Sequence, residues 1–358
     1  MRHLLTSLAA LLIAGCGGAA ADPCAGGEAY PADAFTTNAA AERALAEQLE
    51  AVVGPLGDVN ARPTQAQLQG LFEAGTPSLS SITTPAFAAT LPAIFAAAEE
   101  AAGSTWTPAD PPVDSGGWLG GTLFSNRGVD LQEAVEKGLL GAAHYNEAVR
   151  LMSGDVSPAT VDRVLALYGT TPAFPMDHKA AVNPDTFSAA YAKKRTNPAA
   201  STPGIYLVIK RAFIDARAAS AKGSACQAQR DAALATIRTE WERALVGTVV
   251  YYLNEAAEGL EAPNATQAQR AAALHEYNEA VGLLKGLRTV APASRKMTDA
   301  QLDEMLTTLL APMGAQPESH KLLLDSVTNV PRLTQAVGQL QAAWGFTADE
   351  VANFKVNY

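Results

Sequence analysis

The stretch LATIRTEWERALVGTVVYY, residues 234–252, decides the fold class of this chain. Large side chains recur in it every three or four residues, as one face of an α-helix requires. This stripe consists of Leu234, Ile237, Trp241, Leu245, Thr248 and Tyr252. It predicts a long helix over about residues 227–260 that packs on a core.

Similar stripes predict helices along most of the chain. Alanine is abundant and β-branched runs are scarce, so we expect an all-α protein with closely packed helices. The expected helices cover residues 39–53 (with Asn38 as N-cap), 64–73, 85–102, 129–152, a short one ending at 167, 183–195, 204–221, 266–287, 299–310, 320–327, 333–343 and 347–353.

Glycine and proline interrupt this helical pattern in two places. Residues 103–128 predict a long loop with a small hairpin around Trp118 to Phe124. Residues 168–183 form a second irregular stretch, and residues 196–203 are the expected domain boundary. We therefore expect a first helical bundle over residues 38–200 and a second over residues 201–358.

The chain starts as a bacterial lipoprotein does. A short cationic end, an apolar run over residues 4–14 and small residues precede Cys16. These features predict a signal peptide over residues 1–15, and fatty acyl groups such as palmitate on Cys16. The alternative is an ordinary thiol within a cleaved secretory signal. Residues 16–37 are small, polar and interrupted by proline, and they predict a tether to the folded part.

Charge and hydropathy limit the partners of the protein. It carries 26 Lys and Arg against 36 Asp and Glu, a formal net charge of −10. Nucleic acid and anionic lipid surfaces are therefore poor partners. No later apolar run reaches the length that spans a bilayer, so we expect membrane attachment through Cys16. Gly17 and Gly18 stand where an acidic residue tends to hold lipoproteins at the inner membrane, which favours the outer membrane.

Two further cysteines, Cys24 and Cys226, form the candidate disulfide in an oxidising envelope compartment. The spacing alone also allows two separate thiols.

The sequence Tyr-Asn-Glu-Ala-Val occurs twice, at residues 145–149 and 277–281, and a looser copy lies at 252–256. The offset of 132 residues between the two exact copies matches the size of a helical bundle domain, so a duplicated bundle is expected. Chance similarity within an alanine-rich helical chain is the alternative.

Several motifs resemble those of imelysin-like proteins, and most nearly the lipoproteins of the family called domain of unknown function 4856. They are residues 126–142, 237–242 and 275–280, followed by Met-Thr-Asp-Ala-Gln at 297–301. The resemblance implies two pseudo-symmetric four-helix bundles, an envelope location and a loose link to iron uptake. Thr160, Arg163 and Val164 depart from the family pattern, which puts an ancestral metal site in the first half in doubt.

Two pairs of side chains are candidate metal ligands. His275 and Glu279 share a helix face within a near match to the zincin motif, and His144 and Glu147 resemble the His-x-x-Glu element of imelysins. A helical projection places all four opposite the apolar stripes, which favours a solvated face. A divalent metal or iron is the candidate cofactor, and no catalytic residue is assigned.

Three functions are compatible with this sequence. The first is a lipid-anchored binding or accessory protein of the cell envelope, linked to iron or another metal. The second is a structural lipoprotein that docks a partner. The third is an imelysin-type metallopeptidase with Glu276 as its base.

Overall fold

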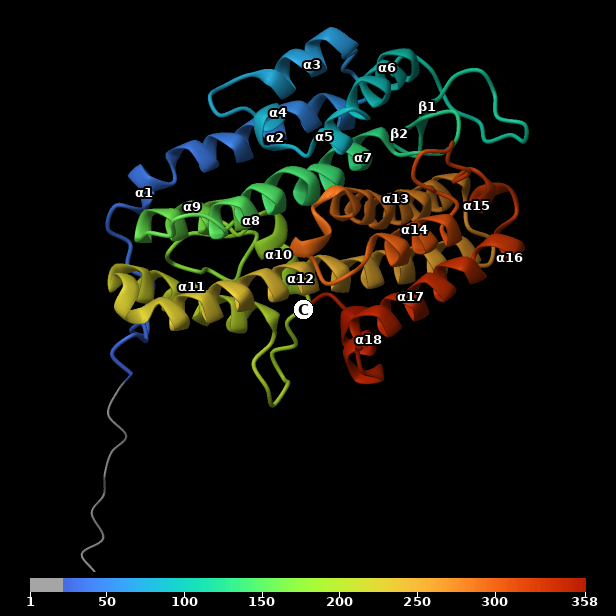
Figure 1. Cartoon of the computed structure of the whole chain (residues 1–358). Helices are drawn as coiled ribbons and strands as arrows, with labels where there is room; N and C mark the ends of the chain where they lie inside the picture. The colour runs from blue at the N-terminus through green and yellow to red at the C-terminus, as the bar shows by residue number, and fades with distance from the viewer. Residues whose placement is uncertain (1–21) are drawn as a thin grey trace, which may run out of the picture.

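The computed structural model describes residues 22–358, and it confirms the all-α fold (Figure 1). The predicted signal peptide and Cys16 lie outside the described residues. The helices are α1 (Phe35–Asn38), α2 (Ala40–Gly57), α3 (Gln65–Glu73), α4 (Leu79–Ile82), α5 (Pro85–Ala88), α6 (Leu91–Ala101), α7 (Leu131–Leu139), α8 (Asn146–Met152), α9 (Pro158–Tyr168), α10 (Phe187–Lys194), α11 (Ile205–Ala221), α12 (Gln227–Glu261), α13 (Gln267–Thr289), α14 (Asp299–Thr308), α15 (Lys321–Leu324), α16 (Ser326–Asn329), α17 (Pro331–Trp344) and α18 (Ala348–Phe354).

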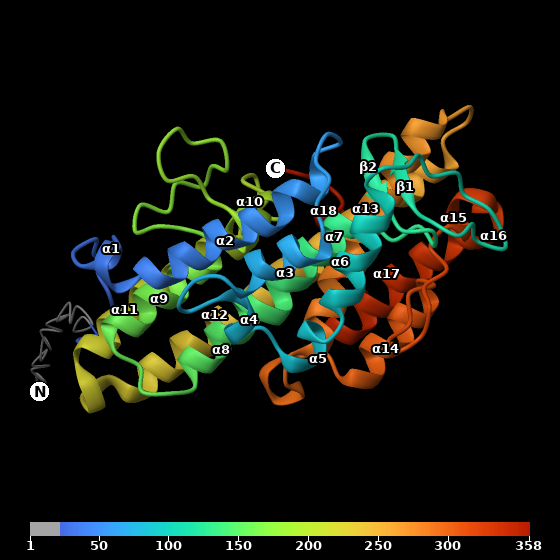
Figure 2. The same ribbon diagram turned by 90° about the horizontal axis from the view of Figure 1, so that it is seen from above.

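The 35-residue helix α12 organises the molecule. Figures 1 and 2 show α11 packed along one end of α12, and α13 and α17 packed along its other end. The predicted stripe from Leu234 to Tyr252 is buried throughout, which confirms its role as a core face. One continuous core runs from Tyr30 to Phe354, and the division into two bundles stays a prediction.

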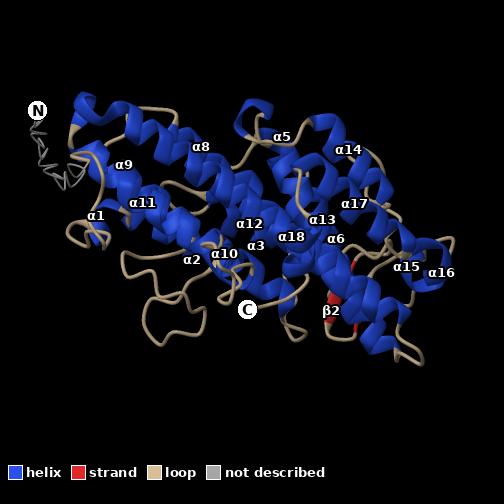
Figure 3. Ribbon diagram, turned by 90° about the horizontal axis from the view of Figure 1, so that it is seen from below, coloured by secondary structure: helices blue, strands red, loops and turns tan. Residues whose placement is uncertain are grey.

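The predicted hairpin is confirmed in the long loop before α7. Strands β1 (Gly117–Leu119) and β2 (Thr122–Phe124) pair antiparallel, and they are the red arrows of Figure 3. Gly120 and Gly121 connect them with φ of 63° and 91°. Both residues of a tight hairpin turn need positive φ, which glycine adopts at little steric cost. The Trp118 indole donates to the carbonyl of Ala102, which ties the hairpin to α6.

The segment before α1 is held against α11 and α12. A disulfide joins Cys24 to Cys226, which confirms the predicted pairing. Residues 22–37 therefore differ from the loose tether that their composition predicts, because Tyr30 and Phe35 are buried. The Tyr30 hydroxyl donates to the buried carboxylate of Asp162 at 2.5 Å.

Several helix boundaries differ from the predicted ones. The region expected as one helix over residues 129–152 contains a π-helical turn at Leu140–Tyr145 between α7 and α8. The helix expected over residues 85–102 is divided into α5 and α6. Asn38 is not the N-cap of α2: it ends α1, Ala39 takes the N-cap position, and the Asn38 side-chain amide donates to Asp162. Within residues 22–358, no helix is both long and apolar enough to cross a bilayer.

Candidate metal centre between two helices

Helix α7 and the π-helical turn that follows it approach α13 so closely that a Cβ atom would collide with backbone at several glycines. A Cβ atom added to Gly141 would lie 2.7 Å from the backbone nitrogen of Leu287. One added to Gly282 would lie 2.7 Å from the carbonyl oxygen of Glu133. Gly286 likewise faces the backbone of Gly138. This contact brings the polar side chains of the neighbouring turns of both helices together.

Asp130 begins α7 and also reaches across to α13. Its Oδ1 accepts hydrogen bonds from the backbone N–H groups of Gln132 and Glu133, as an N-cap does. Its Oδ2 lies 2.7 Å from Nδ1 of His275 on α13. Asp130 is fully buried, whereas the His275 side chain is 32% exposed. The imidazole therefore forms the solvent-accessible side of this contact.

Lys137 lies one helical turn after Glu133 on α7, among three carboxylates. Its Nζ is 3.1 Å from Glu133, 2.6 Å from Glu136 and 3.0 Å from Glu279. The Lys137, Glu133 and Glu279 side chains are each less than 10% exposed. The predicted exposure of Glu279 was wrong, because α7 and α13 pack against each other here and Tyr191 of α10 lies against Lys137.

A three-residue ligand set results from this packing. Asp130, Glu133 and His275 each offer one ligand atom, and these atoms lie within 4.8 Å of one another. They are the one group of three or more such side chains in the described part of the chain. Glu279 lies nearby, with Oε2 3.8 Å from Nε2 of His275. Carboxylate oxygens and imidazole nitrogen suit divalent ions such as Mn²⁺, Fe²⁺ and Zn²⁺.

The cluster changes the proton affinity of its members. Burial opposes charge on His275, but the hydrogen bond and charge of Asp130, aided by Glu133 and Glu279, outweigh burial and raise its pKa to about 9. Burial raises the pKa of Glu133 to about 8. Burial opposes charge on Lys137 too, yet the adjacent carboxylates raise its pKa well above the ordinary value. In the metal-free protein, protons therefore stay on His275 and Glu133 near neutral pH.

We expect the metal-free fold to lose stability as the pH rises from 7 to 9. The raised pKa values of His275 and Glu133 mean that the folded state binds more protons than the unfolded state in this window. The stabilisation that each group adds is complete below its pKa in the unfolded chain and is lost as the pH rises through its pKa in the folded protein. Urea unfolding at pH 7 and pH 9 should differ by about 3 kcal/mol. A His275→Gln variant should show a smaller difference, and an unchanged difference would contradict the assignment.

The second predicted pair, His144 and Glu147, does not form a common site. His144 lies in the π-helical turn, packs edge-on against Phe187, and has no hydrogen-bond partner on either ring nitrogen. Burial lowers its pKa to about 4. Glu147 instead pairs with Arg150 at 2.5 Å. Both residues are buried, so their predicted exposure was wrong as well.

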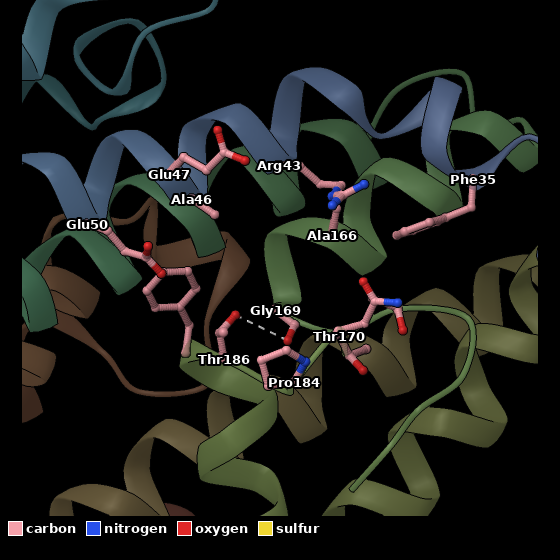
Figure 4. A pocket seen from close by; sticks show the side chains of 13 residues that line it. Phe35, Arg43, Ala46, Glu47, Glu50, Ala166, Gly169, Thr170, Pro184 and Thr186 are labelled. Atoms are coloured by element: carbon pink, nitrogen blue, oxygen red, sulfur yellow. Dashed lines mark hydrogen bonds between the residues drawn. The ribbon is translucent and has the colours of Figure 1, made fainter. Parts of the chain in front are cut away.

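A pocket of about 330 Å³ lies apart from this cluster, between α2 and the loop after α9 (Figure 4). Arg43, Glu47 and Glu50 of α2 line one side, and Thr186 lies opposite, where its hydroxyl donates to the carbonyl of Gly169. The three charged residues are exposed. None of the predicted metal ligands lines the pocket.

A comparison with known protein families finds a match over part of the chain. Residues 167–330 match the family described as Domain of unknown function (DUF4856). The DUF4856 segment runs from the end of α9 to α16 and includes His275 and Glu279, whereas Asp130 and Glu133 precede it. No curated protein and no solved structure matches the chain.

Asp130 and Glu133 were missed in the sequence because each has an ordinary helical role there. Asp130 occupies an N-cap position, and Glu133 lies in the first turn of α7, where acidic residues are favoured. The glycines at 138, 141, 282 and 286 were the available signal, since small residues at helical spacing allow two helices to approach closely.

Proposed function

We propose that this chain is a lipid-anchored binding protein of the bacterial cell envelope, and that it holds a divalent metal ion on Asp130, Glu133 and His275. The observation that carries the proposal is the convergence of these three ligand atoms within 4.8 Å, from two helices in close contact. The accessible imidazole edge offers the ion a route from solvent.

The envelope location rests on three kinds of support. Residues 1–16 have the pattern of a lipoprotein signal, with Cys16 as the acylated residue. The Cys24–Cys226 disulfide is typical of an oxidising compartment. The resemblance to imelysin-like proteins adds an association with iron, which accords with nitrogen and oxygen ligands.

The cluster holds more carboxylates than cations, which leaves room for the charge of a metal ion. Asp130, Glu133, Glu136 and Glu279 are the carboxylates, and among the described residues Lys137 and His275 are the only cationic side chains paired with them. A divalent ion that replaces the His275 proton would neutralise the buried Asp130. Metal binding would then release protons and strengthen as the pH rises.

Calorimetric titration of the purified metal-free protein with Mn²⁺, Fe²⁺ and Zn²⁺ tests this proposal. We expect one ion per chain, with tighter binding at pH 8.5 than at pH 6.5 because His275 and Glu133 must lose protons. His275→Ala and Asp130→Asn should each weaken binding by at least tenfold. Asn can still cap α7, so the second variant removes charge with little change in the helix.

The exposed His178 supplies the matched control. His178→Ala should leave both the affinity and its pH dependence unchanged. The metal proposal fails if no ion binds at either pH, or if His178→Ala and His275→Ala weaken binding equally.

A further inference from the structure

An apolar groove lies where the N-terminal segment meets α11 and α12. Its volume is about 530 Å³, and it is distinct from the metal cluster between α7 and α13. Asp22, Cys24 and Ala25 form one end. Side chains of α11, α12 and the preceding loop line the rest: the apolar Pro203, Leu207, Val208, Ala212, Ala232 and Ala233, and the polar Arg211, Asp215, Gln229 and Thr236.

The groove contains an apolar side chain that is partly exposed to solvent. Leu207 is 42% exposed although it lies within a long, well-packed helix. The alanines at 212, 232 and 233 also line the groove, and their side chains end at Cβ. A concave surface lined largely by apolar side chains is the kind of place where an apolar group binds.

The segment at the end of the groove is fixed in place. The disulfide joins Cys24 to Cys226, and the Gly26 N–H donates to Asp215 of α11 at 2.9 Å. The Arg211 guanidinium donates to the carbonyls of Gly26 and Gly27. Asp22, the first described residue, therefore stays at the edge of the groove.

We propose that this groove holds one acyl chain of the lipid on Cys16. Five residues separate Cys16 from Asp22, and the six residue steps of an extended chain between them span about 20 Å. From Leu207 to Asp215 the groove follows α11 for about 12 Å, so the lipid can reach all of it. The inference rests on the lipidation of Cys16 in the proposed function and is independent of the metal.

A fluorescent fatty acid, dansyl-undecanoic acid, tests the groove directly. A form of the protein that begins at residue 16 and carries Cys16→Ser keeps every described residue, and we expect it to bind one probe per chain. Leu207→Asp should weaken probe binding at least tenfold, because a carboxylate would then lie along the acyl chain. Val327→Asp is the control, since Val327 is 87% exposed on α16 and lies outside the groove.

A second experiment tests whether the lipid on Cys16 is the group that occupies the groove. Full-length protein extracted from membranes, with its lipid shown by mass spectrometry, should bind the probe at least tenfold more weakly than the Cys16→Ser form. The proposal is overturned if the Cys16→Ser form does not bind the probe, if both forms bind it equally, or if Cys16 carries no lipid. Metal titration of the same samples reports on the cluster separately, so a failure of the groove proposal can be distinguished from a failure of the metal site.

Discussion

Replacement of Lys137 by Met should destabilise the fold by about 3–5 kcal/mol at pH 8, as removal of one partner from a buried ion pair does. Met has a similar length and fills the same space. The substitution removes the cation that lies 3.0 Å from the buried Glu279 carboxylate and 3.1 Å from Glu133, which near its pKa of about 8 is ionised in part of the molecules. Urea unfolding followed by circular dichroism would measure the loss.

Lys321 provides the control for this substitution. It pairs with Glu318 at 2.7 Å, but the two side chains are 33% and 44% exposed. Water already solvates such a pair, so Lys321→Met should change stability by less than about 1 kcal/mol. Equal effects of the two substitutions would show that the Lys137 cluster does not depend on its buried charges.

Gly286→Ala should destabilise the protein by about 2–3 kcal/mol, because overpacking forces neighbouring groups to move. A Cβ atom at residue 286 would overlap the backbone of Gly138 on α7, and backbone cannot rotate away as a side chain can. The two helices would have to separate, which would also draw His275 away from Asp130. Thermal and urea unfolding would measure the first effect, and the pH dependence of stability the second.

Gly338→Ala is the matched control within α17. A Cβ atom there meets nothing within 4 Å, so the gain in helix propensity is unopposed. This variant should be more stable by about 0.5–1 kcal/mol. If both glycine variants stabilised the protein, α7 and α13 would not be in the close contact described above.

The parts of the fold that follow from local sequence were predictable. The stripe from Leu234 to Tyr252 predicted α12, and the glycine pair at 120 and 121 lies at the turn of the hairpin predicted around Trp118. The cysteine pair was predicted because secreted proteins tend to form disulfides. The helix and the hairpin follow from residues that are close in sequence, and the disulfide follows from the redox state of the compartment.

The burial of the charged cluster was not predictable by the same means. A helical projection assumes that a helix buries one face, but α7 contacts α2, α6 and α13 together. The side of α7 that carries Glu133 and Lys137 packs against Gly282 of α13 and Tyr191 of α10, so these charged side chains form a buried network. The π-helical turn also shifts the faces of the following residues, so the projection is out of register beyond Leu139.

The metal content of protein purified from its native envelope tests the central claim most directly. Elemental analysis by mass spectrometry should find about one divalent metal ion per chain, and His275→Ala expressed from the same locus should lose it while His178→Ala keeps it. Metal well below one equivalent in the wild-type protein, or an equal content in the His275→Ala protein, would contradict the assignment of Asp130, Glu133 and His275 as the ligands.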